Sequence, residues 1–149
     1  MKILFAIDDN AISSMNLSFV KNFNLTKNSE FWLISVIDMA ITSSPEILSV
    51  GFQTTNEIEN SFIEKARHNL DRVRKELLTY ISPENVQIFT ELLTGSPASR
   101  ILEKAENNNI DLIILGSHYH SALERFILGS VSSPVLHQSK RSVLVFRNN

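Results

Sequence analysis

The sequence predicts an α/β fold in which five parallel strands form one doubly wound, Rossmann-like open sheet with helices on both faces. Two observations lead to this prediction. Short, nearly continuous runs of Ile, Leu, Val and Phe recur along the 149 residues, as expected of strands that helices cover on both sides. Segments with helical periodicity separate these runs, and such alternation favours a parallel sheet with right-handed crossovers.

The predicted strands are five short apolar segments. Four of them are almost uninterrupted, whereas the third contains Gln87, Thr90 and Glu91 among its apolar residues. A mixed pattern of this kind is typical of a strand with one face partly exposed to water, so we expect the third strand at an edge of the sheet. The five segments are residues 3–7, 31–37, 86–93, 112–115 and 143–146.

The clearest helical pattern lies between the second and third strands. Apolar residues recur there every three or four positions, which places them on one stripe of a long amphipathic helix that ends near residue 82. Thr54 and Glu57 have the spacing of a capping box just ahead of this helix. The stripe consists of Ile58, Phe62, Ala66, Leu70, Val73, Leu77 and Ile81.

Three further helices are predicted from their starting residues. Asn10 is a good N-cap for a helix after the first strand. Ser96 followed by Pro97 favours a helix after the third strand, because proline suits the first helical position. A short last helix is expected from about Ser130, with its inward side formed by Val131, Val135 and Leu136.

Ligands of doubly wound sheets bind beyond the carboxyl ends of the strands, where the strand order reverses. The loops after the first, second and fourth strands begin near Asp8, Asp38 and Gly116. Gly129 and Ser130 then lead into the last helix, where unpaired amides and the helix dipole favour an anion such as phosphate. On spacing alone an alternative stays open, in which the two glycines serve tight turns and Ser130 caps a helix.

Charge and composition exclude several classes of partner. Fourteen basic against sixteen acidic side chains leave a net charge of -2, which provides no footprint for nucleic acid or an anionic membrane. The chain contains no cysteine, so disulfides and thiol chemistry are excluded. The first apolar run is too short for a signal peptide, and none approaches the roughly 18 residues that cross a bilayer. We therefore expect a single cytoplasmic domain over residues 1–149.

No arrangement of residues indicates catalysis. The sequence shows neither a nucleophile with a paired base nor the lysine of a phosphate-binding P-loop. His118 and His120 suggest a metal site, but alternate residues share a face only in an extended chain and no carboxylate has a matching spacing. We expect no catalytic residue and no metal site. Beside a phosphate, these histidines could act as protonated donors near neutral pH.

The glycines near the end of the chain match a family pattern. Universal stress proteins carry a glycine, two residues, a second glycine, nine residues, and then glycine followed by serine or threonine. Here Gly116, Tyr119, Gly129 and Ser130 occupy these places, so tyrosine replaces the second glycine. The chain resembles this family over its whole length, with further matches at residues 2–8, 35–38, 95–98, 111–117 and 141–147.

The resemblance implies a fold like that of the adenine nucleotide alpha hydrolases, a homodimer formed through the last strand, and a bound ATP or AMP, with Mg²⁺ as a companion of the phosphates. It places the base near Asp8 and the backbone of Val36. The ribose and phosphates would lie over Gly116, Gly129, Ser130 and Val131. Tyr119 must either contact the nucleotide or obstruct it, and family members without the glycine pattern need not bind nucleotide.

Three alternatives to a nucleotide-binding module stay open. The first is a dimeric scaffold of the same family that binds no nucleotide. The second is a slow ATP hydrolase, for which only His118 or His120 could activate water. The third is a receiver-like phospho-signalling domain, suggested by Asp8 and Asp9, but the third strand lacks the aspartate that such a domain needs at its end. Enzymatic turnover is not indicated.

Overall fold

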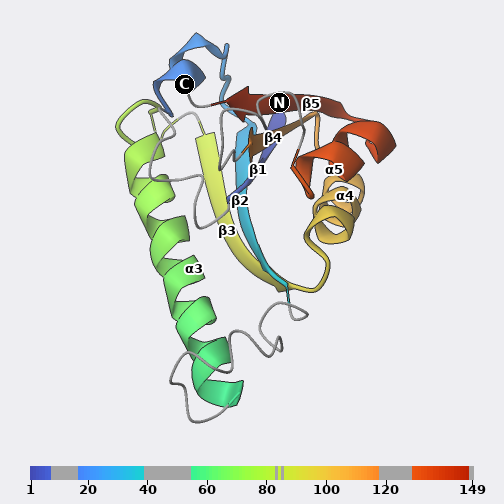
Figure 1. The fold of residues 1–149 in the computed structure, drawn as a ribbon. Helices are drawn as coiled ribbons and strands as arrows, with labels where there is room; N and C mark the ends of the chain where they lie inside the picture. Colours follow the sequence, from blue (N-terminus) through green and yellow to red (C-terminus); the bar gives the residue numbers. More distant parts are fainter. Residues whose placement is uncertain (8–16, 39–54, 83, 85, 118–128, 148–149) are drawn as a thin grey trace.

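The computed structural model describes residues 1–7, 17–38, 55–82, 84, 86–117 and 129–147 (Figure 1). Strands and helices alternate along these residues, as the sequence predicts. The elements are β1 (Lys2–Ala6), the 3₁₀ helix η1 (Leu17–Asn22), β2 (Ser29–Ile37), α3 (Thr55–Leu77), β3 (Val86–Thr94), α4 (Pro97–Asn107), β4 (Leu112–Ser117), α5 (Ser132–Gln138) and β5 (Ser142–Arg147).

The five strands form one sheet in the order β3-β2-β1-β4-β5, and every neighbouring pair is parallel. This confirms the predicted doubly wound, Rossmann-like sheet. The chain moves outward from β1 through β2 to β3 and then returns to the other side of β1 as β4. The order therefore reverses between β1 and β4, which is where such folds bind ligands. The mixed third strand lies at an edge, as predicted.

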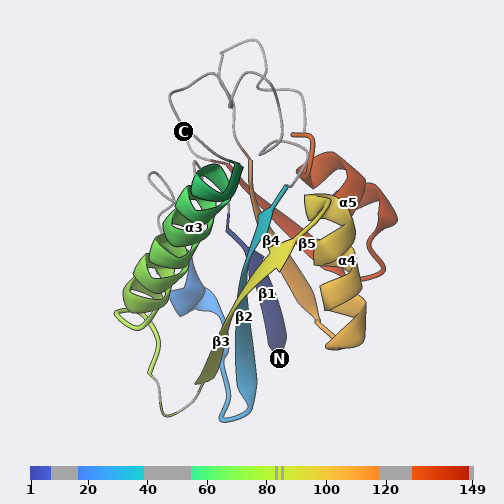
Figure 2. The ribbon, with the colours of Figure 1, turned by 90° about the horizontal axis from the view of Figure 1, so that it is seen from below.

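Helices cover both faces of the sheet (Figure 2). On one face, side chains of α3 and η1 such as Leu70 and Leu17 pack against Phe31 and Leu33 of β2. On the other face, α4 and α5 pack against the alternate residues of the same strands, for example Ile34. Because both faces of β1, β2 and β4 are buried, their sequences read as continuous apolar runs.

Several predicted helix boundaries change in the structure. Helix α3 ends at Leu77, and turns continue to Tyr80 before the chain reaches β3. Helix α5 begins at Ser132 with Val131 as its N-cap, so the predicted start at Ser130 is two residues early. Leu136 was expected to face inward but is 43% exposed, because α5 turns Ser132 and Val135 toward the sheet instead.

Of the predicted helix starts after the first and third strands, the second is confirmed. Ser96 is the N-cap of α4 and Pro97 its first residue, as predicted, although the serine side chain makes no capping hydrogen bond. After the first strand the described chain forms the 3₁₀ helix η1 rather than an α-helix. Asn10 and Thr54, the other two capping candidates, lie outside the described residues.

Candidate functional site

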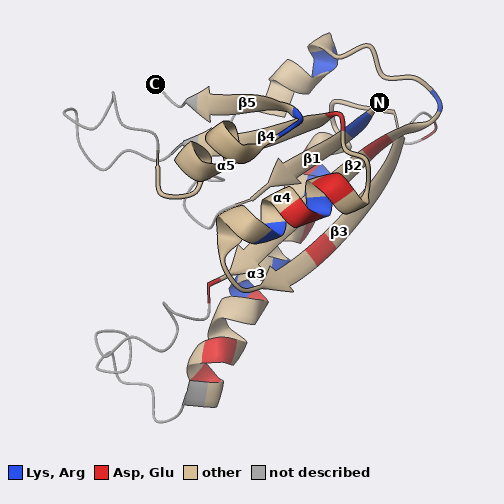
Figure 3. Ribbon diagram, turned by 90° about the vertical axis from the view of Figure 1, so that its right-hand side faces the viewer, with Lys and Arg blue, Asp and Glu red and all other residues tan. Residues whose placement is uncertain are grey.

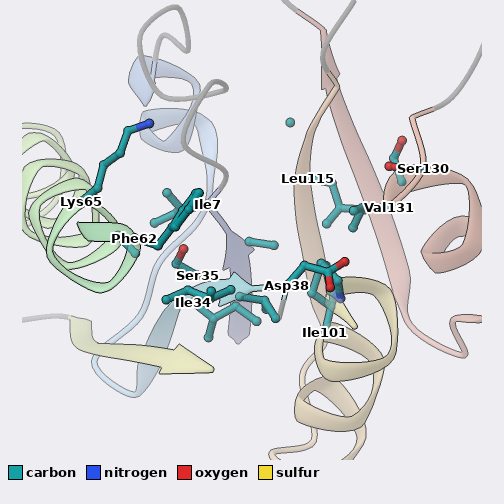
Figure 4. A pocket seen from close by; sticks show the side chains of 17 residues that line it. Ile7, Ile34, Ser35, Asp38, Phe62, Lys65, Ile101, Leu115, Ser130 and Val131 are labelled. Atoms are coloured by element: carbon teal, nitrogen blue, oxygen red, sulfur yellow. The ribbon is translucent and has the colours of Figure 1, made fainter. Parts of the chain in front are cut away.

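A cavity of about 420 Å³ lies at the carboxyl edge of the sheet, between the two helical layers (Figure 4). It is located where the sequence predicts the site, because the ends of β1, β2 and β4 all contribute to it. Its walls come from segments far apart in the chain. The lining residues are Ala6, Ile7, Ile34, Ser35, Val36, Ile37, Asp38, Phe62, Lys65, Ala66, Pro97, Ile101, Leu115, Gly116, Ser130, Val131 and Ser132.

The last residues of β2 form the floor of the cavity. Side chains alternate between the faces of a strand, so Ile34 packs in the α4 layer while the hydroxyl of Ser35 is on the α3 side. Ser35 is only 6% exposed, which makes it a buried polar group at the cavity wall. Asp38 follows directly after the strand and adds a half-buried carboxylate.

One wall of the cavity belongs to α3. Phe62, Lys65 and Ala66 line it, and their spacing of three and four residues places them on one face of the helix. Figure 4 shows Phe62 and Lys65 on this side, opposite Ile101 of α4 and Val131. The cavity is therefore mostly apolar, with an ammonium group from α3 and a carboxylate from the end of β2.

The opposite wall leads into α5. Gly129 has no positive φ, unlike Gly95, so its presence is not explained by a left-handed turn. Its carbonyl oxygen accepts the backbone N–H of Ser133 at 3.0 Å, the first hydrogen bond of α5. Among the described residues, a Cβ at Gly129 would meet the Ser132 Oγ, at 3.5 Å.

The structure brings four of the seven predicted site residues to one cavity. The four that line it are Val36, Gly116, Ser130 and Val131. Gly129 immediately precedes Ser130 in the chain. Gly116 lies within β4, paired with Phe146 of β5, and so does not serve a tight turn. The other two predicted residues, Asp8 and Tyr119, lie outside the described residues, as do His118 and His120.

Sequence reasoning missed the α3 and α4 walls. Phe62 and Ala66 were assigned to the core stripe, and Pro97 only to a helix start. Lys65 carried no signal, because nothing in its neighbourhood in the sequence shows that α3 reaches the carboxyl edge. Ser35 carried a weak signal, since a hydroxyl in an otherwise apolar buried strand needs a polar partner or a cavity.

Two other kinds of site are not found in the described part of the chain. No group of three or more His, Cys, Asp or Glu side chains is arranged to hold a metal ion there. Within the same residues, no helix is both long enough and apolar enough to span a membrane. The cavity at the carboxyl edge is thus the candidate site.

The fold and the position of the cavity define a doubly wound α/β protein with a cavity at its switch point. The family model of the universal stress protein family matches residues 1–147. Universal stress protein MJ0577 of Methanocaldococcus jannaschii is 30% identical, over 98% of this chain and 94% of that protein. The chain belongs to the universal stress protein family.

Other relatives agree with this assignment. Universal stress protein YxiE of Bacillus subtilis is 26% identical, over 98% of both chains. The solved structure of MJ0577 superimposes with a TM-score of 0.74 at 29% identity and covers 99% of this chain and 96% of its own. Universal stress protein UspA of Lactobacillus plantarum shares the fold, with a TM-score of 0.67 at 22% identity and coverage of 99% and 97%.

Proposed function

We propose that this protein is a stress-response module that binds an adenine nucleotide, ATP or AMP, in the cavity at the carboxyl edge of the sheet and acts as a homodimer. One observation carries the nucleotide proposal. Val36, Gly116, Ser130 and Val131 come from three separate parts of the sequence and line the same cavity at the switch point. This is the arrangement by which open α/β sheets hold nucleotides.

The walls have the chemistry that each part of a nucleotide needs. Apolar side chains such as Ile101 and Val131 (Figure 4) can pack against one face of the flat base, while the backbone of Val36 offers hydrogen-bonding groups to its edge. The hydroxyl and amide groups of Ser130 suit a phosphate, and the lack of a side chain at Gly129 would let a phosphate approach the neighbouring amides. Asp8 is assigned to the ribose hydroxyls, and a Mg²⁺ ion would accompany the phosphates.

Two proteins of the same fold support the class of ligand. A universal stress protein crystallised in complex with cAMP superimposes with a TM-score of 0.66 at 14% identity. A universal stress protein family protein from Arabidopsis thaliana with AMP bound superimposes with a TM-score of 0.61 at 17% identity. Both ligands contain adenine, ribose and one phosphate. These parts would occupy the base and phosphate regions described above.

Calorimetry with ATP, ADP and AMP tests the proposal. Gly129→Val should weaken binding at least tenfold, about 1.4 kcal/mol, because a branched side chain would enter the space assigned to phosphate. Gly129→Ala is the matched control for folding, since among the described residues its Cβ meets the Ser132 Oγ at 3.5 Å, an ordinary contact. We expect both variants to retain the thermal midpoint of the wild type. Binding heat that is unchanged by Gly129→Val would contradict the proposed phosphate position.

Tyr119 in place of a glycine favours one alternative, a dimeric scaffold without nucleotide. Tyr119→Gly separates the two functions. A tyrosine that stacks on the ligand predicts a loss of about 1 kcal/mol on removal, whereas an obstructing tyrosine predicts tighter binding. We expect stacking. If neither the wild type nor Tyr119→Gly shows binding heat, the nucleotide proposal is wrong and the dimeric scaffold without nucleotide is the function that stays open. We assign no catalytic residue in either case.

We further propose that the homodimer forms through β5, which lies at the edge opposite β3. The Asp111 N–H donates to the Lys2 carbonyl at 2.8 Å, so odd-numbered residues at the start of β4 face β1. Alternation along the paired strands then directs the N–H and C=O groups of Leu144 outward. Pairing with a second β5 would satisfy this edge.

Proline at Leu144 tests this interface. It removes an outward N–H that β4 does not use, so the sheet is retained while pairing is blocked. Leu144→Ala is the control for the lost side chain, because it keeps the N–H. We expect Leu144→Pro to lower the sedimentation mass below that of the wild type, whereas Leu144→Ala, with the same 16.9 kDa chain mass to within a side chain, should keep the wild-type mass. A sedimentation mass that Leu144→Pro leaves unchanged would refute the β5 interface.

A further inference from the structure

Strand β3 exposes a long open edge at the side of the sheet away from β5. All nine of its residues, Val86–Thr94, pair with β2. No described residue pairs with its other side, since β3 is the terminal strand of the sheet. Figure 3 shows it as the outermost strand below β2. An edge of this length is a template for pairing with another strand.

The direction of each backbone group along this edge follows from two hydrogen bonds. The Gly95 N–H donates to the Ile37 carbonyl at 3.0 Å, so odd-numbered residues of β3 face β2. The even-numbered residues therefore face outward. The Thr94 carbonyl confirms this, because it accepts the Arg100 Nε at 2.9 Å instead of a strand partner. The N–H and C=O groups of Ile88, Thr90 and Leu92 remain directed outward.

The sequence of β3 lacks the proline and lysine residues that commonly protect an edge strand. It contains no proline, lysine or arginine, and its single charged residue is Glu91; Figure 3 shows one acidic segment on this strand. That carboxylate is paired with Lys104 of α4, so it lies over the sheet and not along the edge. Thr90 is exposed and Phe89 is 36% exposed. An uncharged, partly apolar edge of this kind is suited to being covered.

The aromatic side chains beside the β3 edge are already fixed by contacts within the subunit. The Phe89 ring stacks on Trp32 with centroids 4.4 Å apart and an interplanar angle of 21°. The Trp32 Nε1 donates to Glu30 Oε2 at 2.9 Å, and the Lys104 Nζ lies 4.5 Å from the Trp32 ring. A contact surface that is already ordered loses little conformational entropy when a partner binds.

We propose that β3 pairs antiparallel with β3 of a second copy of this chain, with the two-fold axis at Thr90. This register places Thr90 opposite its own copy, and Ile88 opposite Leu92. Glu91 would lie opposite Phe89 and not opposite a second glutamate, and Lys104 already neutralises it. The register therefore places no like charges opposite one another, as a two-fold interface requires.

The proposed pairing is independent of nucleotide binding and of the β5 interface. A dimer formed through β5 would place its two β3 strands at opposite ends of one continuous sheet. If both edges pair, the protein assembles beyond a dimer in a manner that depends on concentration, because each subunit then contacts two others, one at each edge of its sheet.

Cysteine cross-linking tests the register directly, since the chain has no cysteine of its own. Residues opposite each other in a hydrogen-bonded antiparallel pair have Cα atoms about 5.5 Å apart, within the range that a disulfide spans. Thr90→Cys should therefore form a covalent dimer under mild oxidation. Gln87→Cys is the matched control, because it is also exposed on β3 but would lie about 20 Å from its own copy.

We expect the disulfide-linked fraction on a non-reducing gel to be at least about tenfold higher for Thr90→Cys than for Gln87→Cys, because pairing raises the effective concentration of the two thiols. Equal cross-linking of the two variants, or none in either, would overturn the proposal. Thermal midpoints equal to that of the wild type would show that both variants fold.

Charge substitution gives a second readout that does not use disulfides. Thr90→Lys and Thr90→Glu each place like charges opposite one another across the axis, which opposes pairing. A mixture of the two variants restores opposite charges. Sedimentation velocity should show the species joined through β3 for the wild type and for the mixture. Either variant alone should sediment as a smaller species. A wild-type mass that neither variant reduces would also overturn the proposal.

Discussion

Replacing Lys104 with methionine should lower the free energy of unfolding by about 1–2 kcal/mol, and the structure shows why. The ammonium group lies 4.5 Å from the Trp32 ring centroid, and its side chain is only 17% exposed. A cation–π contact at such a site contributes about 0.5–2 kcal/mol. The ion pair with Glu91 adds about 0.2–1 kcal/mol, because that carboxylate is 37% exposed and screened by water. Methionine keeps the apolar contacts of the lysine stem.

Urea unfolding provides the assay. The midpoint should fall at an unchanged m-value, with a thermal midpoint lower by about 2–8 °C. A double-mutant cycle with Trp32→Leu should isolate a coupling of about 0.5–1 kcal/mol. Lys75→Met is the control: Lys75 pairs with Asp71 on the exposed side of α3, so its loss should leave the midpoint nearly unchanged. A Lys104–Trp32 coupling below about 0.3 kcal/mol would refute the reasoning.

Three further predictions concern the scaffold. Chemical denaturation should show that Ile114→Ala lowers the free energy of unfolding by about 2–5 kcal/mol and Ile114→Val by about 0.5–1.5 kcal/mol. The reason is that Ile114 is fully buried and pairs with Phe5 of β1 and Leu144 of β5. Equal losses for the two variants would contradict this packing. Gly95→Ala should cost about 1–3 kcal/mol, because Gly95 has φ +123° at the turn from β3 to α4, and a neutral result would show that the turn relaxes. Trp32→Phe should raise the pKa of Glu30 toward its ordinary value in an NMR titration, because the Trp32 hydrogen bond is the main cause of its lowered pKa and the Lys2 ammonium is a further one.

The sign of the pH dependence follows from that lowered pKa. The ionised Glu30 carboxylate is favoured in the folded protein, so its stabilisation is present above the pKa of the unfolded chain and is lost as the pH falls through the folded pKa. In Trp32→Phe the folded and unfolded pKa values of Glu30 should lie closer together. Acidification should then remove less of the free energy of unfolding through Glu30 than it does in the wild type. An unchanged titration of Glu30 in the variant would contradict this.

Much of the fold could be predicted because it depends on patterns within short segments. Continuous apolar runs such as residues 31–37 identify strands that are buried on both faces, and these imply helices on both sides and parallel pairing. The polar residues Gln87, Thr90 and Glu91 placed β3 at an edge, as the structure confirms. The glycine pattern ending at Gly129 and Ser130 identified the family and one wall of the cavity.

The tertiary structure alone decided which distant residues meet. Lys65 and Phe62 line the cavity only because the N-terminal half of α3 lies at the carboxyl edge of the sheet (Figure 2), and no local pattern encodes that placement. Likewise, the stack of Trp32 on Phe89 depends on the register between β2 and β3, and the exposure of Leu136 depends on how α5 is rotated on the sheet. Periodicity within a segment determines which face is apolar, but the packing of the whole chain determines what that face contacts.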